Sequence, residues 1–105
     1  MDINEFDEYI KKTPSVLVYL STEACSVCKV LKPKIINMLD TSFPKMDFLY
    51  IDCEKQKEIA AQNTVFAVPT ILVFFEGKEN IRKSRSVGIE QLKSEIKRIY
   101  ELMFD

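Results

Sequence analysis

The alternation of apolar and polar positions along the chain predicts four strands and four helices. Apolar, β-branched runs indicate buried strands, and a polar stretch after a glycine-centred turn at residues 76–80 indicates an outermost strand. We expect the strands at residues 15–21, 46–53, 70–75 and 81–87. Apolar residues at helical spacing predict helices at residues 2–12, 25–40, 56–63 and 89–103. The order is therefore α-β-α-β-α-β-β-α.

This order predicts an α/β fold with a four-stranded mixed β-sheet. The first two strands are linked through a helix, so we expect them to be parallel neighbours in a right-handed crossover. The run at residues 46–53 is apolar almost throughout, which favours a central strand covered on both faces. The last two strands form a hairpin, and the helices flank both faces of the sheet.

Composition fits one globular domain spanning residues 1–105. Hydrophobic residues make up 47% and charged residues 30% of the chain, a balance unlike that of a disordered protein. The net charge of −1 gives no reason to expect a nucleic-acid partner. The basic run at residues 82–85 is interpreted as a solvated sheet edge, with a weak anionic contact as the alternative.

The amino-terminal segment does not have the pattern of a secretion signal. It is acidic and lacks a positively charged stretch followed by an apolar one, and no apolar run is long enough to cross a bilayer. We therefore expect a cytoplasmic protein without a membrane partner. Purely structural disulfides are rare in the cytoplasm, so cysteines there more often serve catalysis or metal binding.

Cys25 and Cys28 stand between the first predicted strand and the helix that follows it. Two thiols one helical turn apart can close into a disulfide and open again, so the pair indicates reversible thiol chemistry. In open α/β sheets, working sites lie beyond the carboxyl ends of the strands. Both cysteines are expected at that end of the strand at residues 15–21.

Position along the helix predicts different roles for the two thiols. Cys25 lies at or next to the helix N-cap, where unpaired backbone N–H groups favour a negatively charged sulfur. It is therefore expected to attack a substrate disulfide. Cys28, one turn further in and more buried, then attacks Cys25 and releases the reduced substrate. Cys25 is the predicted nucleophile and Cys28 the predicted resolving thiol.

Five features in order along the chain resemble the thioredoxin family. They are the segment Cys25-Ser26-Val27-Cys28-Lys29, Pro33 in the helix, Val68-Pro69-Thr70 before a buried strand, Gly77 in the hairpin and Gly88 before the last helix. The resemblance covers essentially the whole chain and implies a thioredoxin-like fold. It also implies a thiol–disulfide oxidoreductase that reduces protein disulfides, without a cofactor, in electron transport and cell redox homeostasis. Thioredoxin reductase or another dithiol donor would recharge the site, and we expect a monomer.

The resemblance further implies a cis peptide bond between Val68 and Pro69, beside the cysteines. Such a bond would leave the backbone N–H and C=O of Val68 free to pair with an extended substrate segment. The alternative is an ordinary strand that begins with a trans proline. The surface around the disulfide is implied to be small and apolar, and it comprises Ala24, Ser26, Val27, Ala67, Val68, Pro69, Val87 and Gly88.

Several positions near the site differ from the family. The tryptophan that usually precedes the first cysteine is Ala24 here, and Ser26 and Val27 stand in place of Gly-Pro. The family's buried aspartate falls at Tyr19, and its lysine partner falls at Tyr50. We expect these two tyrosines to pack together as a core pair rather than to relay protons.

Three other residues have open roles. Glu23 and Glu54 are alternative acids near the site, and the sequence does not select one of them. Cys53 ends the strand at residues 46–53, at the same sheet edge as the cysteine pair. It is expected to be a buried, inert thiol, or alternatively a regulatory thiol open to glutathionylation or to an intermolecular bridge.

Metal binding and binding without turnover are the rival functions. Zinc usually takes four Cys or His ligands, whereas this chain has three cysteines and no histidine, so a zinc site would need a carboxylate or a second chain. An iron–sulfur cluster between two chains is a further alternative. The absence of the family's aspartate and tryptophan is the reason for a second alternative, a thioredoxin-fold binding module with little or no turnover. Both cysteines are present, which favours the oxidoreductase, and no metal is expected.

Overall fold

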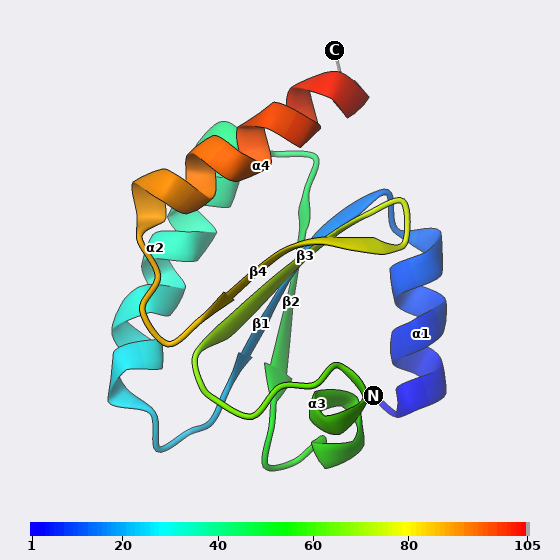
Figure 1. The fold of residues 1–105 in the computed structure, drawn as a ribbon, viewed down its shortest axis with the longest axis vertical. Helices are drawn as coiled ribbons and strands as arrows, with labels where there is room; N and C mark the ends of the chain where they lie inside the picture. Colours follow the sequence, from blue (N-terminus) through cyan, green and yellow to red (C-terminus); the bar gives the residue numbers. More distant parts are fainter. Residues whose placement is uncertain (105) are drawn as a thin grey trace.

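The computed structural model of the protein, which describes residues 1–104, is built around a four-stranded sheet with the strand order β2-β1-β3-β4 (Figure 1). The elements are α1 (Ile3–Lys12), β1 (Ser15–Ser21), α2 (Ser26–Ser42), β2 (Asp47–Asp52), α3 (Lys57–Gln62), β3 (Thr70–Phe75), β4 (Lys78–Ser84) and α4 (Ile89–Phe104). β1 runs parallel to β2 and antiparallel to β3, and β4 is antiparallel to β3. The predicted element order and the mixed sheet are confirmed.

Helices cover both faces of the sheet. On one face, α2 and α4 enclose a cluster of buried side chains that includes Tyr19, Cys28, Ile35 and Ile96. On the other face, α1 and α3 enclose a second cluster around Phe6, Val18 and Ile59. Because successive residues of a strand point to opposite faces, β1 contributes to both clusters and is buried along its whole length.

The predicted central position of the second strand is wrong. β2 lies at the edge of the sheet, where it pairs with β1, and its first residue, Asp47, is exposed. Phe48 and Tyr50 pack against one cluster while Leu49 and Ile51 pack against the other. A continuous apolar run therefore indicates that helices cover both faces of the strand. It does not indicate whether the strand has neighbours on both of its edges or on one.

The hairpin is tighter than predicted. The expected turn at residues 76–80 is a two-residue turn of Glu76 and Gly77, so β4 occupies Lys78–Ser84 rather than residues 81–87. Glu76 and Gly77 both have positive φ angles, of 54° and 78°. Two central residues with positive φ are the mark of a type I′ turn, whose twist matches that of the strands it joins. The outermost position of the last strand is confirmed.

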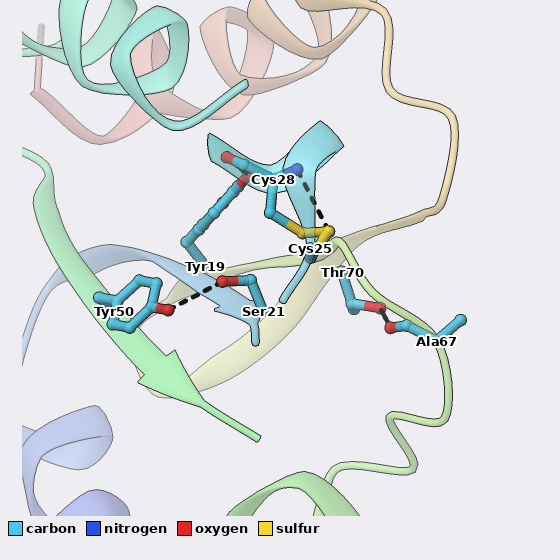
Figure 2. The surroundings of a disulfide bond; sticks show 7 residues. All are labelled: Tyr19, Ser21, Cys25, Cys28, Tyr50, Ala67 and Thr70. Atoms are coloured by element: carbon cyan, nitrogen blue, oxygen red, sulfur yellow. Dashed lines mark hydrogen bonds between the residues drawn. A yellow bond between two sulfur atoms is a disulfide. The ribbon is translucent and has the colours of Figure 1, made fainter. Parts of the chain in front are cut away.

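Tyr19 joins the centre of the sheet to the first turn of α2. Its side chain is fully buried, and its hydroxyl donates a 2.7 Å hydrogen bond to the backbone carbonyl of Cys28 (Figure 2). Its ring packs against that of Tyr50, with 6.3 Å between centroids, so the predicted core pair is confirmed. Burial, and to a lesser extent the neighbouring Tyr50, raises the pKa of Tyr19 to about 12.

Replacing Gly77 should destabilise the fold through the backbone alone. A Cβ at this position would meet Ile10 and Lys11 atoms at an ordinary 3.8 Å, so the cost of Gly77→Ala comes from the positive φ. We expect a loss of about 1 kcal/mol in the free energy of unfolding, measured with urea. Glu76→Asn should have the opposite sign, a gain of about 0.5 kcal/mol, because asparagine tolerates this conformation better. Equal effects of the two substitutions would contradict the turn assignment.

Tyr19 should make the protein sensitive to alkaline pH. The pKa of Tyr19 is 10.0 in the unfolded chain and about 12 in the fold. The contribution of neutral Tyr19 to the free energy of unfolding is therefore complete below pH 10 and is lost as the pH rises toward 12. The loss should amount to about 2–3 kcal/mol in urea unfolding of the oxidised protein. Tyr19→Phe should flatten this decline.

The same substitution should cost about 1 kcal/mol at neutral pH, because the Cys28 carbonyl loses its phenol donor. Tyr9 leaves a residual slope in both proteins, since burial and its hydrogen bond to Asp47 also raise its pKa to about 12. An alkaline decline as steep in Tyr19→Phe as in the unsubstituted protein would contradict this account.

Candidate active site

A disulfide between Cys25 and Cys28 lies where β1 leads into α2 (Figure 2). Cys25 is the N-cap residue of α2, and Cys28 lies in the first turn of the helix, with 5.3 Å between the two Cα atoms. Cys25 is half-buried, whereas Cys28 is only 2% exposed. Of the two sulfurs, that of Cys25 is therefore the one that an incoming molecule can reach.

The helix end presents hydrogen-bond donors to the sulfur of Cys25. The backbone N–H of Cys28 donates to Cys25 Sγ over 3.2 Å, in the geometry by which an N-cap side chain satisfies a free donor. The positive end of the helix dipole acts at the same point. Both effects favour negative charge on Cys25 Sγ once the disulfide is open.

The segment that precedes β3 is fixed beside this site. The peptide bond between Val68 and Pro69 is cis. The Thr70 hydroxyl donates a 2.6 Å hydrogen bond to the carbonyl of Ala67 (Figure 2). The backbone N–H of Arg85 donates to the carbonyl of Pro69 over 2.8 Å. Within residues 1–104, the backbone N–H and C=O of Val68 have no hydrogen-bond partner. These two backbone groups of Val68 are therefore available to pair with an extended chain, as the edge of a strand does.

The residues predicted around the disulfide come from three loops and, for Ser26 and Val27, from the first turn of α2. Cys25, Val68 and Val87 all pack against the core cluster that contains Cys28, so the structure brings one residue from each loop to that cluster. The predicted surface residues differ in exposure: Ala24, Ser26, Val27 and Gly88 are exposed, Ala67, Val68 and Val87 are half-buried, and Pro69 is buried. Pro69 thus supports the loop from beneath rather than forming its surface.

Sequence reasoning missed an apolar groove next to this loop. The groove has a volume of about 390 Å³ and lies between α3 and the proline loop. Its lining residues are Thr22, Cys53, Lys57, Ala60, Ala61, Val65, Phe66, Ala67 and Val68. The ring of Phe66 is 84% exposed, which is unusual for so large an apolar side chain. The apolar residues directly before Val68 were the available signal in the sequence.

Cys53 lies at the predicted sheet edge but on the other face from Cys28. It directly follows β2, and its backbone N–H donates to the carbonyl of Ser21 over 2.8 Å. Its half-buried side chain packs against the α1/α3 cluster. Burial, together with the negative charge of Asp52, raises the pKa of the Cys53 thiol. The environment of Cys53 therefore disfavours the reactive thiolate form.

A small cavity, with polar and charged residues in its lining, borders Cys28 on the side of β2. Its volume is about 190 Å³, and it is lined by Ser21, Thr22, Glu23, Cys28, Lys29, Lys32 and Tyr50. Of the two acids left open by the sequence, Glu23 lies on this cavity, whereas Glu54 lines a different pocket beside Met1. Sequence reasoning did not single out Lys32, because its place depends on the packing of α2 against β2.

The described part of the chain has neither a cluster of metal ligands nor a membrane-spanning helix. Among residues 1–104, no group of three or more Cys, Asp or Glu side chains is arranged to hold a metal ion. None of the helices within that range is long and apolar enough to cross a membrane.

Comparison with known proteins shows similarity to thioredoxins over nearly the whole chain. The family model described as Thioredoxin matches residues 1–98. The thioredoxin-like protein YdfQ of Bacillus subtilis (strain 168) is 34% identical over 96 residues, covering 91% of this chain and 85% of that protein. Thioredoxin-1 of Saccharomyces cerevisiae is 34% identical over 76 residues, covering 72% of this chain and 73% of that protein.

A solved structure gives the same result. Thioredoxin 1 of the thermophilic eubacterium Thermosipho africanus superimposes with a TM-score of 0.77 at 29% identity, covering 86% of this chain and 99% of that one. The family match spans the elements that carry the disulfide and the cis proline. The chain therefore belongs to the thioredoxin family and is a thiol–disulfide oxidoreductase.

Proposed function

We propose that the protein reduces disulfides of other proteins by dithiol exchange, with Cys25 as the nucleophile and Cys28 as the resolving thiol. The observation that carries this assignment is the hydrogen bond from the N–H of Cys28 to Cys25 Sγ at the N-cap of α2. That position stabilises a thiolate, and the half-buried Cys25 is open to a substrate while Cys28 is enclosed.

The reaction proceeds in two exchanges. The Cys25 thiolate attacks one sulfur of the substrate disulfide, and the other substrate sulfur leaves with the bonding electron pair and takes up a proton. Cys28 then loses its proton and attacks Cys25 Sγ. The bond between Cys25 and the substrate breaks, and the second substrate sulfur leaves as a thiolate that is protonated in turn. The substrate gains two electrons, and the protein ends with the Cys25–Cys28 disulfide.

An extended substrate segment would bind along Val68. Its backbone could pair with the N–H and C=O of Val68, which lack partners within the described residues. Around this edge, Ala24, Ser26 and Val27 offer a small and mostly apolar surface, and the exposed ring of Phe66 extends it. Ala67, Val87 and Gly88 complete the proposed contact surface, and the buried Pro69 supports it from beneath.

Recharging the site requires a dithiol donor. Thioredoxin reductase or another dithiol of low potential would return the Cys25–Cys28 disulfide to the reduced form. We place this cycle in the cytoplasm, where the glutathione and thioredoxin systems keep thiols reduced, and we propose that residues 1–105 act as one domain and as a monomer.

Removal of the Cys25 thiol should abolish turnover. We expect the unsubstituted protein to accelerate the reduction of insulin by dithiothreitol, measured as turbidity, and Cys25→Ser to return the rate to the uncatalysed value. Cys53→Ser is the matched control, since it removes a thiol on the opposite face of the sheet, and it should retain the full rate. A wild-type rate equal to the uncatalysed one would leave a binding module without turnover as the better description.

Removal of the Cys28 thiol should trap substrates. Cys28→Ser cannot resolve the mixed disulfide, so protein adducts should accumulate on Cys25 and be released by reductant. Peptide mapping by mass spectrometry locates the adduct. The double variant Cys25→Ser, Cys28→Ser should trap nothing, and adducts found equally on Cys53 would contradict the assignment of roles.

A further inference from the structure

The resolving step requires the thiol of Cys28 to be ionised. Cys28 must lose its proton before it can attack Cys25, yet its side chain is 2% exposed and lies in an apolar cluster. Burial of this kind opposes the formation of a thiolate. The tyrosine hydroxyl of Tyr19 donates to the carbonyl of Cys28 and brings no charge to the site. Some other group must therefore favour the ionised sulfur.

Charged side chains lie beside Cys28 in the lining of the cavity of about 190 Å³. Several water molecules, each of about 30 Å³, would fit in this volume and could take up the proton. The titratable groups that line this cavity with Cys28 are Tyr50 from β2, Glu23 from the loop after β1, and Lys29 and Lys32 from α2, while Tyr19 from β1 contacts Cys28 through its hydroxyl. Glu23 is paired with Lys55 at 3.3 Å, and its side chain is 77% exposed. Its charge is therefore compensated and well solvated.

Lys32 is the cation held in place at this cavity. It follows Cys28 by four residues on the same helix, which puts the two side chains on one face of α2. Its Nζ lies 4.3 Å from the centroid of the Tyr50 ring, an arrangement in which the ring attracts the ammonium group. The Tyr50 hydroxyl in turn accepts a 3.0 Å hydrogen bond from Ser21 (Figure 2). Lys32 is half-buried, whereas Lys29 is exposed.

We propose that Lys32, held over Tyr50, promotes the resolving step by favouring the thiolate of Cys28. This inference rests on the proposed function, because it concerns the second exchange of the same reaction. The proton of Cys28 passes to water in the cavity, and the positive charge of Lys32 stabilises the sulfur that remains. The thiolate then attacks Cys25 Sγ, and the substrate sulfur leaves with the electron pair of the broken bond.

A two-phase reaction with Ellman's reagent separates the two exchanges. In the reduced protein, attack by Cys25 releases one nitrothiobenzoate, and attack by Cys28 on the resulting mixed disulfide releases the second. All proteins carry Cys53→Ser so that only these two thiols react. The rates of both phases are followed by absorbance as a function of pH. The pH midpoint of the second phase reports the ionisation of Cys28.

Lys32→Met should act on the second phase alone. We expect its midpoint to rise by on the order of one pH unit and its rate at neutral pH to fall roughly tenfold, with the first phase changed by less than about twofold. Lys32→Arg keeps the charge and should restore the second phase. Lys34→Met is the matched control, since it removes an exposed lysine from the same helix away from the cavity, and it should leave both phases unchanged.

Three outcomes would overturn the inference. One is a second phase of Lys32→Met with an unshifted midpoint and a rate within about twofold of the reference protein. Another is an equal effect in Lys34→Met, which would point to the net charge of the helix. The third is equal slowing of both phases, which would point to a disturbed helix. If the reference protein lacks the first phase, the proposed function itself fails, so the two failures are distinguishable.

Discussion

The contact between the first turn of α2 and Tyr19 of β1 is the constraint on which the active site depends. The Tyr19 hydroxyl binds the carbonyl of Cys28 from within the sheet, while the N–H of Cys28 points at Cys25 Sγ. One residue of α2 is thus bound at both of its backbone polar groups. The direction of the helix, and with it the positive end that faces Cys25, follows from this attachment. Displacing α2 from the sheet would break the hydrogen bond between Tyr19 and the Cys28 carbonyl.

The sheet divides the three thiols between two chemical environments. Cys28 belongs to the α2/α4 face, with two lysines in the lining of the cavity beside it, whereas the side chain of Cys53 packs on the α1/α3 face beside Asp52. A negative neighbour and burial both disfavour a thiolate on Cys53, and the positive groups near Cys28 favour one. Burial opposes ionisation of both thiols, and the charged groups nearest to them differ in sign.

Local pattern was enough to predict the elements, the mixed sheet and the cysteine pair at the N-cap of α2, because these follow from periodicity and from residues adjacent in the chain. The edge position of β2 could not be predicted in this way, since hydrophobicity reports cover on the faces of a strand and not its number of neighbours. The cavity beside Cys28 could not be predicted from the sequence either. Lys32 and Tyr50 are far apart in sequence, and only the packing of α2 on β2 brings them together.

The proposed substrate edge at Val68, whose backbone is unpaired within residues 1–104, has a consequence for which disulfides the protein can reach. A segment can add to such an edge only in extended form, with its own amide groups released from other bonds. Disulfides inside a helix or a fully paired sheet must first come free by a fluctuation of the client protein. The free energy of that local opening, a property of the client, then sets the order in which native proteins are reduced.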